Sequence, residues 1–442
     1  MVYPVTGDPL VPSPNLPALE NAVQEFWRVD DTFRASIAQR EGAEEFVFYD
    51  GPPFANGLPH YGHLLTGFAK DVIPRFRTMC GDRVDRRFGW DTHGLPAELE
   101  AMRELGMTEK SEIEAMGLKE FNNAAKASVL KYTKEWEEYV TRQARWVDFE
   151  NDYKTLDVTF MESVLWAFKT LYDKDRAYEG YYVLPYCWKD QTPLSAHELR
   201  MDDDVYQERQ DQTVTVTFPF TGQKAAELGL EGVSALAWTT TPWTLPTNFS
   251  LAVGPELEYS VVPAGPLGAG DGTAAGEGRY LMATALLGGY AKELGYEGAE
   301  EILAAAEPRV FTGSELEHVA YTPLWTVYSE DRSTWGTQNA WIVTVADYVS
   351  TDDGTGVVHQ ATAYGEIDQQ VNAAYGIPVI VSVDDGAQFL DYFAGTELDE
   401  IAGVQVFEAN RPIIRNLQRS GRLLREASYV HSYPHCWRSG TP

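Results

Sequence analysis

Two histidines, His60 and His63, stand three residues apart where a loop is expected to meet a helix. At that spacing two side chains lie on one face of the first helical turn. Two imidazoles there can contact a phosphoryl group and stabilise the charge that grows during its transfer. From the residues alone two other interpretations stay open: a capping or packing pair, and a zinc pair, although no third ligand stands nearby.

The residues around this pair predict a strand, a loop and a helix. Residues 46–49 form a short apolar run of the kind that makes a buried strand. Residues 50–59 contain two glycines and three prolines, which predicts a loop. From Tyr61 apolar residues recur at helical spacing, at Leu64, Leu65, Phe68, Val72 and Phe76. Such a strand, loop and helix start present free backbone N–H groups, the usual seat of a phosphate.

A second group of polar residues lies in the middle of the chain. Residues 238–246 bring four threonines and two tryptophans together, and residues 354–368 place His359 and Asp368 around a glycine-rich turn. A threonine-rich edge can bind a small polar group, and a carboxylate can bind an ammonium group. From the residues alone, an ordinary edge strand is the alternative explanation for the threonines.

Composition restricts the class of protein. A chain of 442 residues, 44% of them hydrophobic, is too long for one core and predicts two or three domains. Because there is no apolar run of membrane-spanning length and no secretory signal at the N-terminus, we expect no membrane partner. Three cysteines, Cys80, Cys187 and Cys436, cannot form a disulfide framework, which favours a cytoplasmic location.

The net charge of −31, from 35 basic and 66 acidic residues, argues against a nucleic-acid-binding protein when it is taken alone. One local exception lies around the predicted helix, where six basic residues cluster: Lys70, Arg75, Arg77, Arg83, Arg86 and Arg87. They are either a phosphate-binding patch or ordinary solvated charges.

The segment His60-Tyr61-Gly62-His63 resembles the His-x-Gly-His motif of class I aminoacyl-tRNA synthetases. Residues 50–59 before it and 89–96 after it resemble the isoleucyl branch of that family, whereas the valyl and leucyl branches differ at both places. The resemblance runs from about residue 15 to the last residue. It implies an α/β fold, in which a Rossmann-like parallel sheet, incomplete in this chain, carries an inserted β-barrel-rich editing domain.

The resemblance implies ATP-dependent activation of isoleucine and its transfer to tRNA(Ile), with magnesium accompanying ATP. It gives His60 and His63 the stabilisation of the α-phosphate transition state. Gly62 would complete the ATP site by letting adenine approach the backbone, because a Cβ would intrude there. The resemblance assigns the recognition of isoleucine to three other residues, Gly51, Pro52 and Asp91. We expect a monomer whose partners are tRNA(Ile), isoleucine and ATP.

The two stretches in the middle of the chain resemble elements of the editing domain. The resemblance implies that Asp368 holds the α-amino group of a mischarged aminoacyl end while water hydrolyses its ester. The pocket would be lined by Thr239, Thr240, Thr241, Trp243 and His359. One methylene in a hydrophobic pocket is worth about 1–3 kcal/mol, a range known from isoleucyl enzymes themselves, so a second pocket that admits valine would supply the missing discrimination.

The predicted domains are an N-terminal arm (1–44), the first half of the catalytic domain (45–195), the inserted editing domain (196–428) and a return strand (429–442). Helices are expected at residues 17–38, 102–146, 161–172, 286–294 and 366–375. Strands are expected at residues 181–186, 213–218, 235–240, 257–262, 280–283, 341–345, 356–359 and 379–381.

Residues 185–193 and 434–442 match position for position as Pro-x-Cys-Trp-basic-x-x-Thr-Pro. We infer that they are the outgoing and returning connections of the insert and lie side by side. Some relatives carry Cys-x-x-Cys zinc knuckles here. Asp190 and Ser439 replace the second cysteine of each knuckle, so only Cys187 and Cys436 remain and zinc is left out of the expected cofactors.

No Lys-Met-Ser-Lys-Ser loop, which the family carries in the second half of its nucleotide fold, occurs in the sequence. We therefore expect this chain to support editing hydrolysis at most, and no isoleucine-dependent ATP–pyrophosphate exchange. Alternatives to the isoleucyl interpretation are a valyl or leucyl enzyme and a stand-alone aminoacyl-tRNA deacylase or tRNA-binding module.

Overall fold

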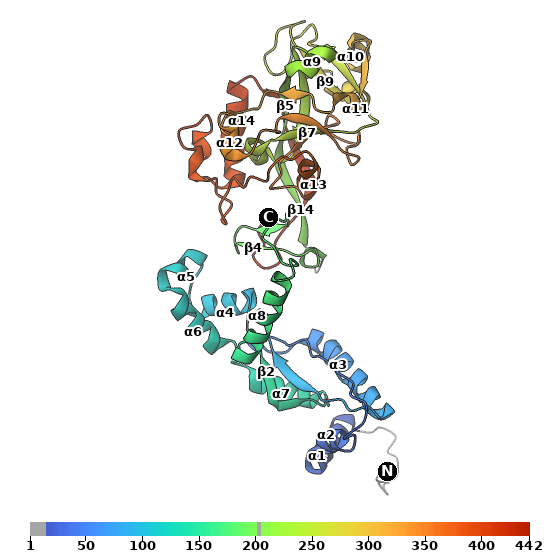
Figure 1. Ribbon diagram of the computed structural model, residues 1–442, viewed down its shortest axis with the longest axis vertical. Coiled ribbons are helices and arrows are strands. Elements are labelled where there is room, and N and C mark those ends of the chain that lie inside the picture. Colours follow the sequence, from blue (N-terminus) through green and yellow to red (C-terminus); the bar gives the residue numbers. More distant parts are fainter. Residues whose placement is uncertain (1–14, 201–204) are drawn as a thin grey trace. The chain divides into compact units, whose positions relative to one another are not determined.

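The computed structural model describes residues 15–200 and 205–442, which fall into two compact units that divide between Glu179 and Gly180 (Figure 1). Among these residues, no helix has both the length and the apolar character needed to cross a bilayer. The three boundaries between the four domains drawn from the sequence stay predictions.

The first unit places helices around a short parallel sheet. Strands β1 (Arg87–Trp90) and β2 (Asp148–Lys154) pair in parallel, and such strands need a long, usually helical, crossover between them. This arrangement confirms the predicted α/β class. The helices are α1 (Leu16–Asp30), α2 (Thr32–Ala38), α3 (Tyr61–Cys80), α4 (Leu95–Leu105), α5 (Lys110–Met116), α6 (Leu118–Ser128), α7 (Thr133–Arg142) and α8 (Val158–Tyr172).

The strand predicted at residues 46–49 is wrong. The backbone there is linked to its neighbours only through isolated parallel bridges, Glu45 with Arg83 and Phe54 with Asp91. Two successive prolines, at 52 and 53, have no N–H to donate and prevent a continuous ladder. Val47 and Tyr49 are 64% and 86% exposed, so their apolar character does not mark a buried strand.

The second unit is built on one large mixed sheet. Its strand order is β10-β8-β9-β6-β13-β7-β12-β11-β5-β14, and β5 also pairs with β6. That extra pairing closes the strands from β6 through β13, β7, β12 and β11 to β5 into a ring, which confirms the β-barrel character expected of the insert. The bounds are β5 (Tyr206–Thr221), β6 (Val233–Thr239), β7 (Ser250–Val253), β8 (Glu258–Pro263), β9 (Arg279–Ala283), β10 (Val310–Thr312), β11 (Ala320–Tyr321), β12 (Ile342–Val345), β13 (Val357–Gln360) and β14 (Leu423–Pro434).

Short elements complete the second unit. The α-helices are α9 (Gly222–Leu228), α10 (Ala299–Ala305), α11 (Gly313–Leu316), α12 (Arg332–Trp335), α13 (Glu366–Ala374) and α14 (Val406–Arg419). The 3-10 helices are η1 (Glu198–Arg200), η3 (Pro242–Thr247), η4 (Thr284–Tyr290), η5 (Asp391–Phe393) and η6 (Asp399–Ile401), and a small hairpin joins β3 (Tyr186–Cys187) to β4 (Thr192–Pro193).

Two further predicted strands are wrong. Of residues 181–186 only Tyr186 belongs to a strand, because Pro185 has no N–H for a ladder. Residues 379–381 form no strand, and the N–H of Ser382, which follows them, is donated to the Tyr364 hydroxyl instead of to a neighbouring strand.

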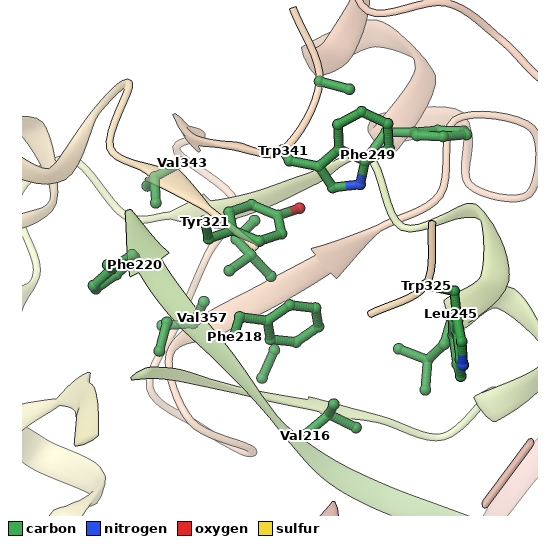
Figure 2. Packing of buried hydrophobic residues seen from close by; sticks show 14 of the residues in the cluster. Val216, Phe218, Phe220, Leu245, Phe249, Tyr321, Trp325, Trp341, Val343 and Val357 are labelled. Carbon is green, nitrogen blue, oxygen red and sulfur yellow. The ribbon is translucent and has the colours of Figure 1, made fainter. Parts of the chain in front are cut away.

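Aromatic side chains fill the barrel (Figure 2). Phe218 on β5 meets Tyr321 on β11 edge-on at 5.4 Å between ring centroids, and Phe249 meets Trp341 at 6.1 Å. All four are buried. Because fully burying one such side chain contributes about 1.5–3 kcal/mol, this packing gives the strands that carry the polar residues a rigid support.

Strands β5 and β14 form a long antiparallel ladder that begins where Tyr206 pairs with Pro434 (Figure 1). The two matching segments, residues 185–193 and 434–442, are therefore brought together. The indole N–H of Trp188 donates to the carbonyl of Pro442 at 3.1 Å. The inference that these segments lie side by side is confirmed.

Candidate functional site

His60 and His63 build the N-terminal cap of α3. The backbone N–H of Gly62 donates to Nδ1 of His60 at 3.1 Å, and the N–H of His60 donates to Nδ1 of His63 at 3.0 Å. A Cβ at Gly62 would lie 3.0 Å from the His60 ring, so this cap favours glycine there independently of any ligand. Both imidazoles are thus fixed at a helix start, where backbone N–H groups and the helix dipole favour an anion.

The caps also fix the tautomers of the two rings. Because each Nδ1 accepts a hydrogen bond, each neutral ring carries its proton on Nε2. Among the described residues neither Nε2 has a hydrogen-bond partner, and His60 is exposed. Burial lowers the pKa of His63, with the neighbouring His60 and Lys70 adding to the effect. The pair therefore offers two N–H donors to an anion, and capping and phosphate contact are compatible roles.

A buried ionic network that the sequence analysis missed supports the loop before α3. The carboxylate of Asp50 contacts Lys70 Nζ at 2.6 Å and Arg145 Nη2 at 2.5 Å, and the Tyr153 hydroxyl donates to the Asp50 carbonyl at 3.0 Å. Lys70 also donates to the carbonyl of Gly51 at 2.6 Å. The loop is thereby held against α3 and β2.

The three residues assigned to isoleucine lie on this same loop and strand end. The N–H of Asp91 donates to Pro53 at 3.0 Å, which ties the end of β1 to the loop that holds Gly51 and Pro52. The Asp91 carboxylate accepts the N–H of His93 at 3.2 Å. Gly51 is exposed, and a Cβ there would meet no atom within 4 Å. Their roles toward isoleucine stay predictions.

The basic cluster around α3 is engaged within the unit. Arg86 is buried, and burial lowers its pKa to about 10, while Arg87 donates to the carbonyl of Asn151 at 2.7 Å. Four ion pairs account for the other members: Lys70–Asp50, Arg75–Asp71, Arg77–Asp82 and Arg83–Asp85. These contacts favour structural charges over a phosphate-binding patch.

In the second unit the threonines form a turn at the end of β6. The N–H of Thr241 donates to the Thr239 hydroxyl at 3.1 Å, and the two hydroxyls lie 3.2 Å apart. Thr240 between them is half-buried, and η3 begins directly after Thr241. The turn presents a short row of hydroxyl groups, rather than the continuation of an edge strand.

His359 on β13 is sealed beneath this turn. Asn248 Nδ2 lies 2.8 Å from its Nδ1, and the Thr244 hydroxyl lies 3.0 Å from its Nε2. If Asn248 donates to Nδ1, the ring donates from Nε2 to Thr244, whose hydroxyl donates to the Thr241 carbonyl at 2.8 Å. Burial lowers the pKa of His359 to about 3, so it is neutral at pH 7. It supports the threonine turn and is poorly placed to exchange protons with water.

Asp368 lies in the first turn of α13, and its Oδ2 accepts the N–H of Ala361 at 2.9 Å. Burial raises the pKa of Asp368 to about 6. Among the described residues no cation lies within ion-pair distance of this half-buried carboxylate, and a carboxylate without a cationic partner attracts a positively charged group. Ala361 follows His359 by two residues, so β13 connects the carboxylate to the threonine turn.

Asn372 is a supporting residue that the sequence analysis did not identify. It is fully buried, and its Nδ2 donates to the Asp368 carbonyl at 2.7 Å and to Gln360 Oε1 at 2.9 Å. The first turn of α13 is thereby fixed to β13. Its burial is not visible in the sequence, so no local signal marked this supporting role.

Trp243, in η3, packs edge-on against Tyr364 at 4.8 Å between ring centroids. Both rings line a cavity of about 440 Å³, together with Tyr186, Val383 and Tyr433. The cavity is mostly apolar and borders the threonine-bearing element. The structure therefore brings Thr239, Thr241, Trp243 and His359 into one region.

Zinc does not fit the paired segments at residues 185–193 and 434–442. The described residues supply three donors whose ligand atoms lie within 4.8 Å of one another, Cys187, Asp190 and Cys436, whereas structural zinc sites use four. Asp190 Oδ2 lies 3.5 Å from Arg438 Nε, so a cation is already in place at this oxygen.

Comparison with known proteins covers the site residues of both units. A family model described as tRNA synthetases class I (I, L, M and V) matches residues 22–373. The chain belongs to this family. Isoleucine--tRNA ligase of Leifsonia xyli subsp. xyli (strain CTCB07) is 65% identical over 441 residues, which are 99% of this chain and 39% of that protein.

Other relatives of this class I synthetase chain carry the same name. Isoleucine--tRNA ligase of Tropheryma whipplei (strain Twist) is 54% identical over 98% of the chain, and that of Mycobacterium tuberculosis (strain ATCC 25618 / H37Rv) is 54% identical over 97%. The chain spans 39% of the length of each. The editing domain of the P. knowlesi cytosolic leucyl-tRNA synthetase matches 51% of the chain and 97% of itself, at 11% identity and a TM-score of 0.35.

Proposed function

We propose that this chain is the part of an isoleucine--tRNA ligase that holds the first half of the ATP site and the whole editing pocket. The observation that carries the proposal is Asp368, a half-buried carboxylate without a cation among the described residues, fixed beside the strand that supports the threonine turn. It would bind the α-ammonium group of valine on tRNA(Ile), and Thr239, Thr240, Thr241, Trp243 and His359 would form or support the pocket.

In the first unit, the Nε2–H groups of His60 and His63 would donate to the phosphates of ATP and stabilise charge at the α-phosphate. Gly62 would leave room for adenine. Isoleucine would lie near Gly51, Pro52 and Asp91, and Mg²⁺ would accompany ATP. The cytoplasmic location and the monomeric state expected from the sequence stay predictions.

The alternative of a stand-alone deacylase or tRNA-binding module needs only the second unit. It gives no reason for two histidines held as Nε2–H donors at a helix start. The family match to residues 22–373 also includes most of the first unit. A valyl or leucyl enzyme is disfavoured by the isoleucine--tRNA ligase relatives at 65% and 54% identity.

The experiment that tests the proposal is a comparison of deacylation rates. The chain is incubated with Val-tRNA(Ile) and with Ile-tRNA(Ile) at pH 7.5, and the remaining aminoacyl-tRNA is measured. We expect faster hydrolysis of the valyl ester, by about 10–200-fold, the discrimination that one methylene provides. Equal rates for the two esters, or none above the spontaneous rate, would contradict the proposed editing function.

A further inference from the structure

The paired segments hold each other through reciprocal contacts of their cysteines. Cys187 Sγ lies 3.4 Å from the Ser439 hydroxyl, and Cys436 Sγ donates to Asp190 Oδ2 at 3.5 Å. Cys187 therefore contacts the residue three positions after Cys436, and Cys436 contacts the residue three positions after Cys187. The same two segments also share the hydrogen bond from Trp188 to Pro442.

Both thiols are buried, but both border the cavity of about 440 Å³ that also reaches Trp243 and Tyr364. Their sulfur atoms are within 4.8 Å of each other. A small neutral oxidant can enter a cavity of this size, and a disulfide would require the two sulfur atoms to approach to about 2.05 Å.

We propose that Cys187 and Cys436 are a peroxide-sensitive dithiol that closes into a disulfide and joins the two ends of the second unit. The partner in this chemistry is hydrogen peroxide. The inference is independent of the editing function, because it rests on segments outside the threonine turn and α13.

The geometry assigns the roles of the two cysteines. Cys436 gives its proton to Asp190, and its sulfur attacks one peroxide oxygen; the O–O bond breaks, hydroxide leaves as water after protonation, and a sulfenic acid forms. The Cys187 sulfur then attacks the Cys436 sulfur, the S–O bond breaks and a second water leaves with the Cys187 proton. The two cysteines lose two electrons and the peroxide gains two. Burial raises the pKa of the Cys187 thiol and so lowers its thiolate fraction, which is why the attack on peroxide is not assigned to it.

The test uses the Cys80→Ser variant, because Cys80 is exposed and would otherwise cross-link chains. The protein is treated with hydrogen peroxide, the remaining thiols are blocked, and proteolytic peptides are analysed by mass spectrometry without reduction. We expect a peptide pair linked through residues 187 and 436, a loss of two hydrogen atoms in mass, and a higher Tm that dithiothreitol reverses. Asp190→Asn should slow formation of the link several-fold without lowering its final yield.

Cys187→Ser and Cys436→Ser are the matched controls. Each keeps a hydrogen-bonding group at its position and should fold, and neither should form the link or show the rise in Tm. The proposal is overturned if peroxide leaves both thiols free, or if each is oxidised singly without a link. It is also overturned if the untreated protein contains one zinc ion per chain that is lost in Cys187→Ser.

Discussion

In the first unit His60 and His63 stand at an open helix start, whereas in the second unit His359 is enclosed under the threonine turn. The first two have Nδ1 committed to backbone N–H groups and Nε2 free of protein partners among the described residues, while both nitrogens of His359 are hydrogen-bonded to side chains. Burial and hydrogen-bond partners therefore decide what an imidazole can do. The exposed ring of His60 and the half-buried ring of His63 can meet a ligand, whereas the buried ring of His359, with both nitrogens hydrogen-bonded, can only support one.

The polar networks that support the two sites differ in charge. Asp50 in the first unit is neutralised by Lys70 and Arg145, so the loop is held by charge. In the second unit the network around His359 is neutral, and the half-buried carboxylate of Asp368 has no cation among the described residues. The carboxylate of the first network is therefore neutralised by side chains of its own unit, whereas the Asp368 carboxylate is not.

The largest effect is expected from removing the shared anion of the first unit. Asp50→Ala leaves Arg145 buried, at 7% side-chain exposure, without its partner. Breaking a buried pair in this way costs about 3–5 kcal/mol, and we expect the unfolding free energy to fall by that amount. The measurement is a urea titration, together with the hydrogen-exchange rates of the backbone amides of α3. Asp85→Ala, which removes an exposed partner of Arg83, should change the unfolding free energy by less than about 1 kcal/mol. Equal losses of unfolding free energy in Asp50→Ala and Asp85→Ala would show that the buried network is not essential for the stability of the first unit.

Asp368→Asn should stabilise the second unit at neutral pH. The pKa of Asp368 is about 6 in the folded state and about 3.9 in an unfolded chain. Since folding raises this pKa, the favourable contribution of Asp368 to the unfolding free energy is fully present below about pH 4 and is lost as the pH rises through 6. At pH 7.5 the ionised carboxylate therefore destabilises the fold, by up to about 3 kcal/mol at 1.36 kcal/mol per pKa unit.

The measurement is the unfolding free energy of wild type and Asp368→Asn at pH 7.5 and pH 4. The difference should favour the variant at pH 7.5 and vanish at pH 4. Glu366→Gln, an exposed acid in the same helical turn, is the control and should show no such dependence. A less stable Asp368→Asn at pH 7.5 would mean that the carboxylate already has a cationic partner.

Thr244→Val tests the neutral network around His359. The substitution keeps the shape of the side chain but leaves one buried ring nitrogen without a partner, which costs about 1–3 kcal/mol. The exposed Thr322→Val should change the unfolding free energy by about 0.5 kcal/mol or less. Equal Tm values for Thr244→Val and wild type would refute the supporting role of His359.

The smallest change in stability is expected from His60→Asn, which sharpens the contrast with His359. Asparagine is a good N-cap, so this variant should keep the stability of α3, whereas His60→Ala should lose about 0.5–2 kcal/mol. Both variants lose the Nε2–H donor, and we expect both to bind ATP–Mg²⁺ more weakly than wild type, by about tenfold in a calorimetric titration. Unchanged ATP affinity in His60→Asn would leave capping as the only role of His60.

Local patterns predicted most of the fold. The apolar repeat after Tyr61 gives α3, alternating residues give most of the barrel strands, and the matching proline–cysteine segments give their pairing. The apolar run at residues 46–49 was wrongly predicted as a buried strand, because two prolines follow it and its Val47 and Tyr49 side chains are exposed. Periodicity reports which side chains are apolar, but it cannot show whether a neighbour exists to bury them.

The sites were predictable only through resemblance, and their supports were not predictable at all. Asp50 and Arg145 are 95 residues apart in the chain, and Asn248 and His359 are 111 apart. Such pairs carry no local signal, because any buried donor or acceptor can be satisfied by many residue types at many distances in sequence. Asp368 was identified by its motif, whereas its raised pKa follows only from burial in the folded unit.

The most direct test of the account is the rate at which the Asp368→Ala variant hydrolyses Val-tRNA(Ile), with Glu366→Ala as the control in the same helical turn. Loss of a buried charge-assisted contact to the substrate ammonium costs about 2–5 kcal/mol, so the variant should be slower by at least about 30-fold while the control keeps the wild-type rate. If Asp368→Ala cleaves the ester as fast as wild type, the carboxylate does not hold the substrate and the proposed editing pocket is wrong.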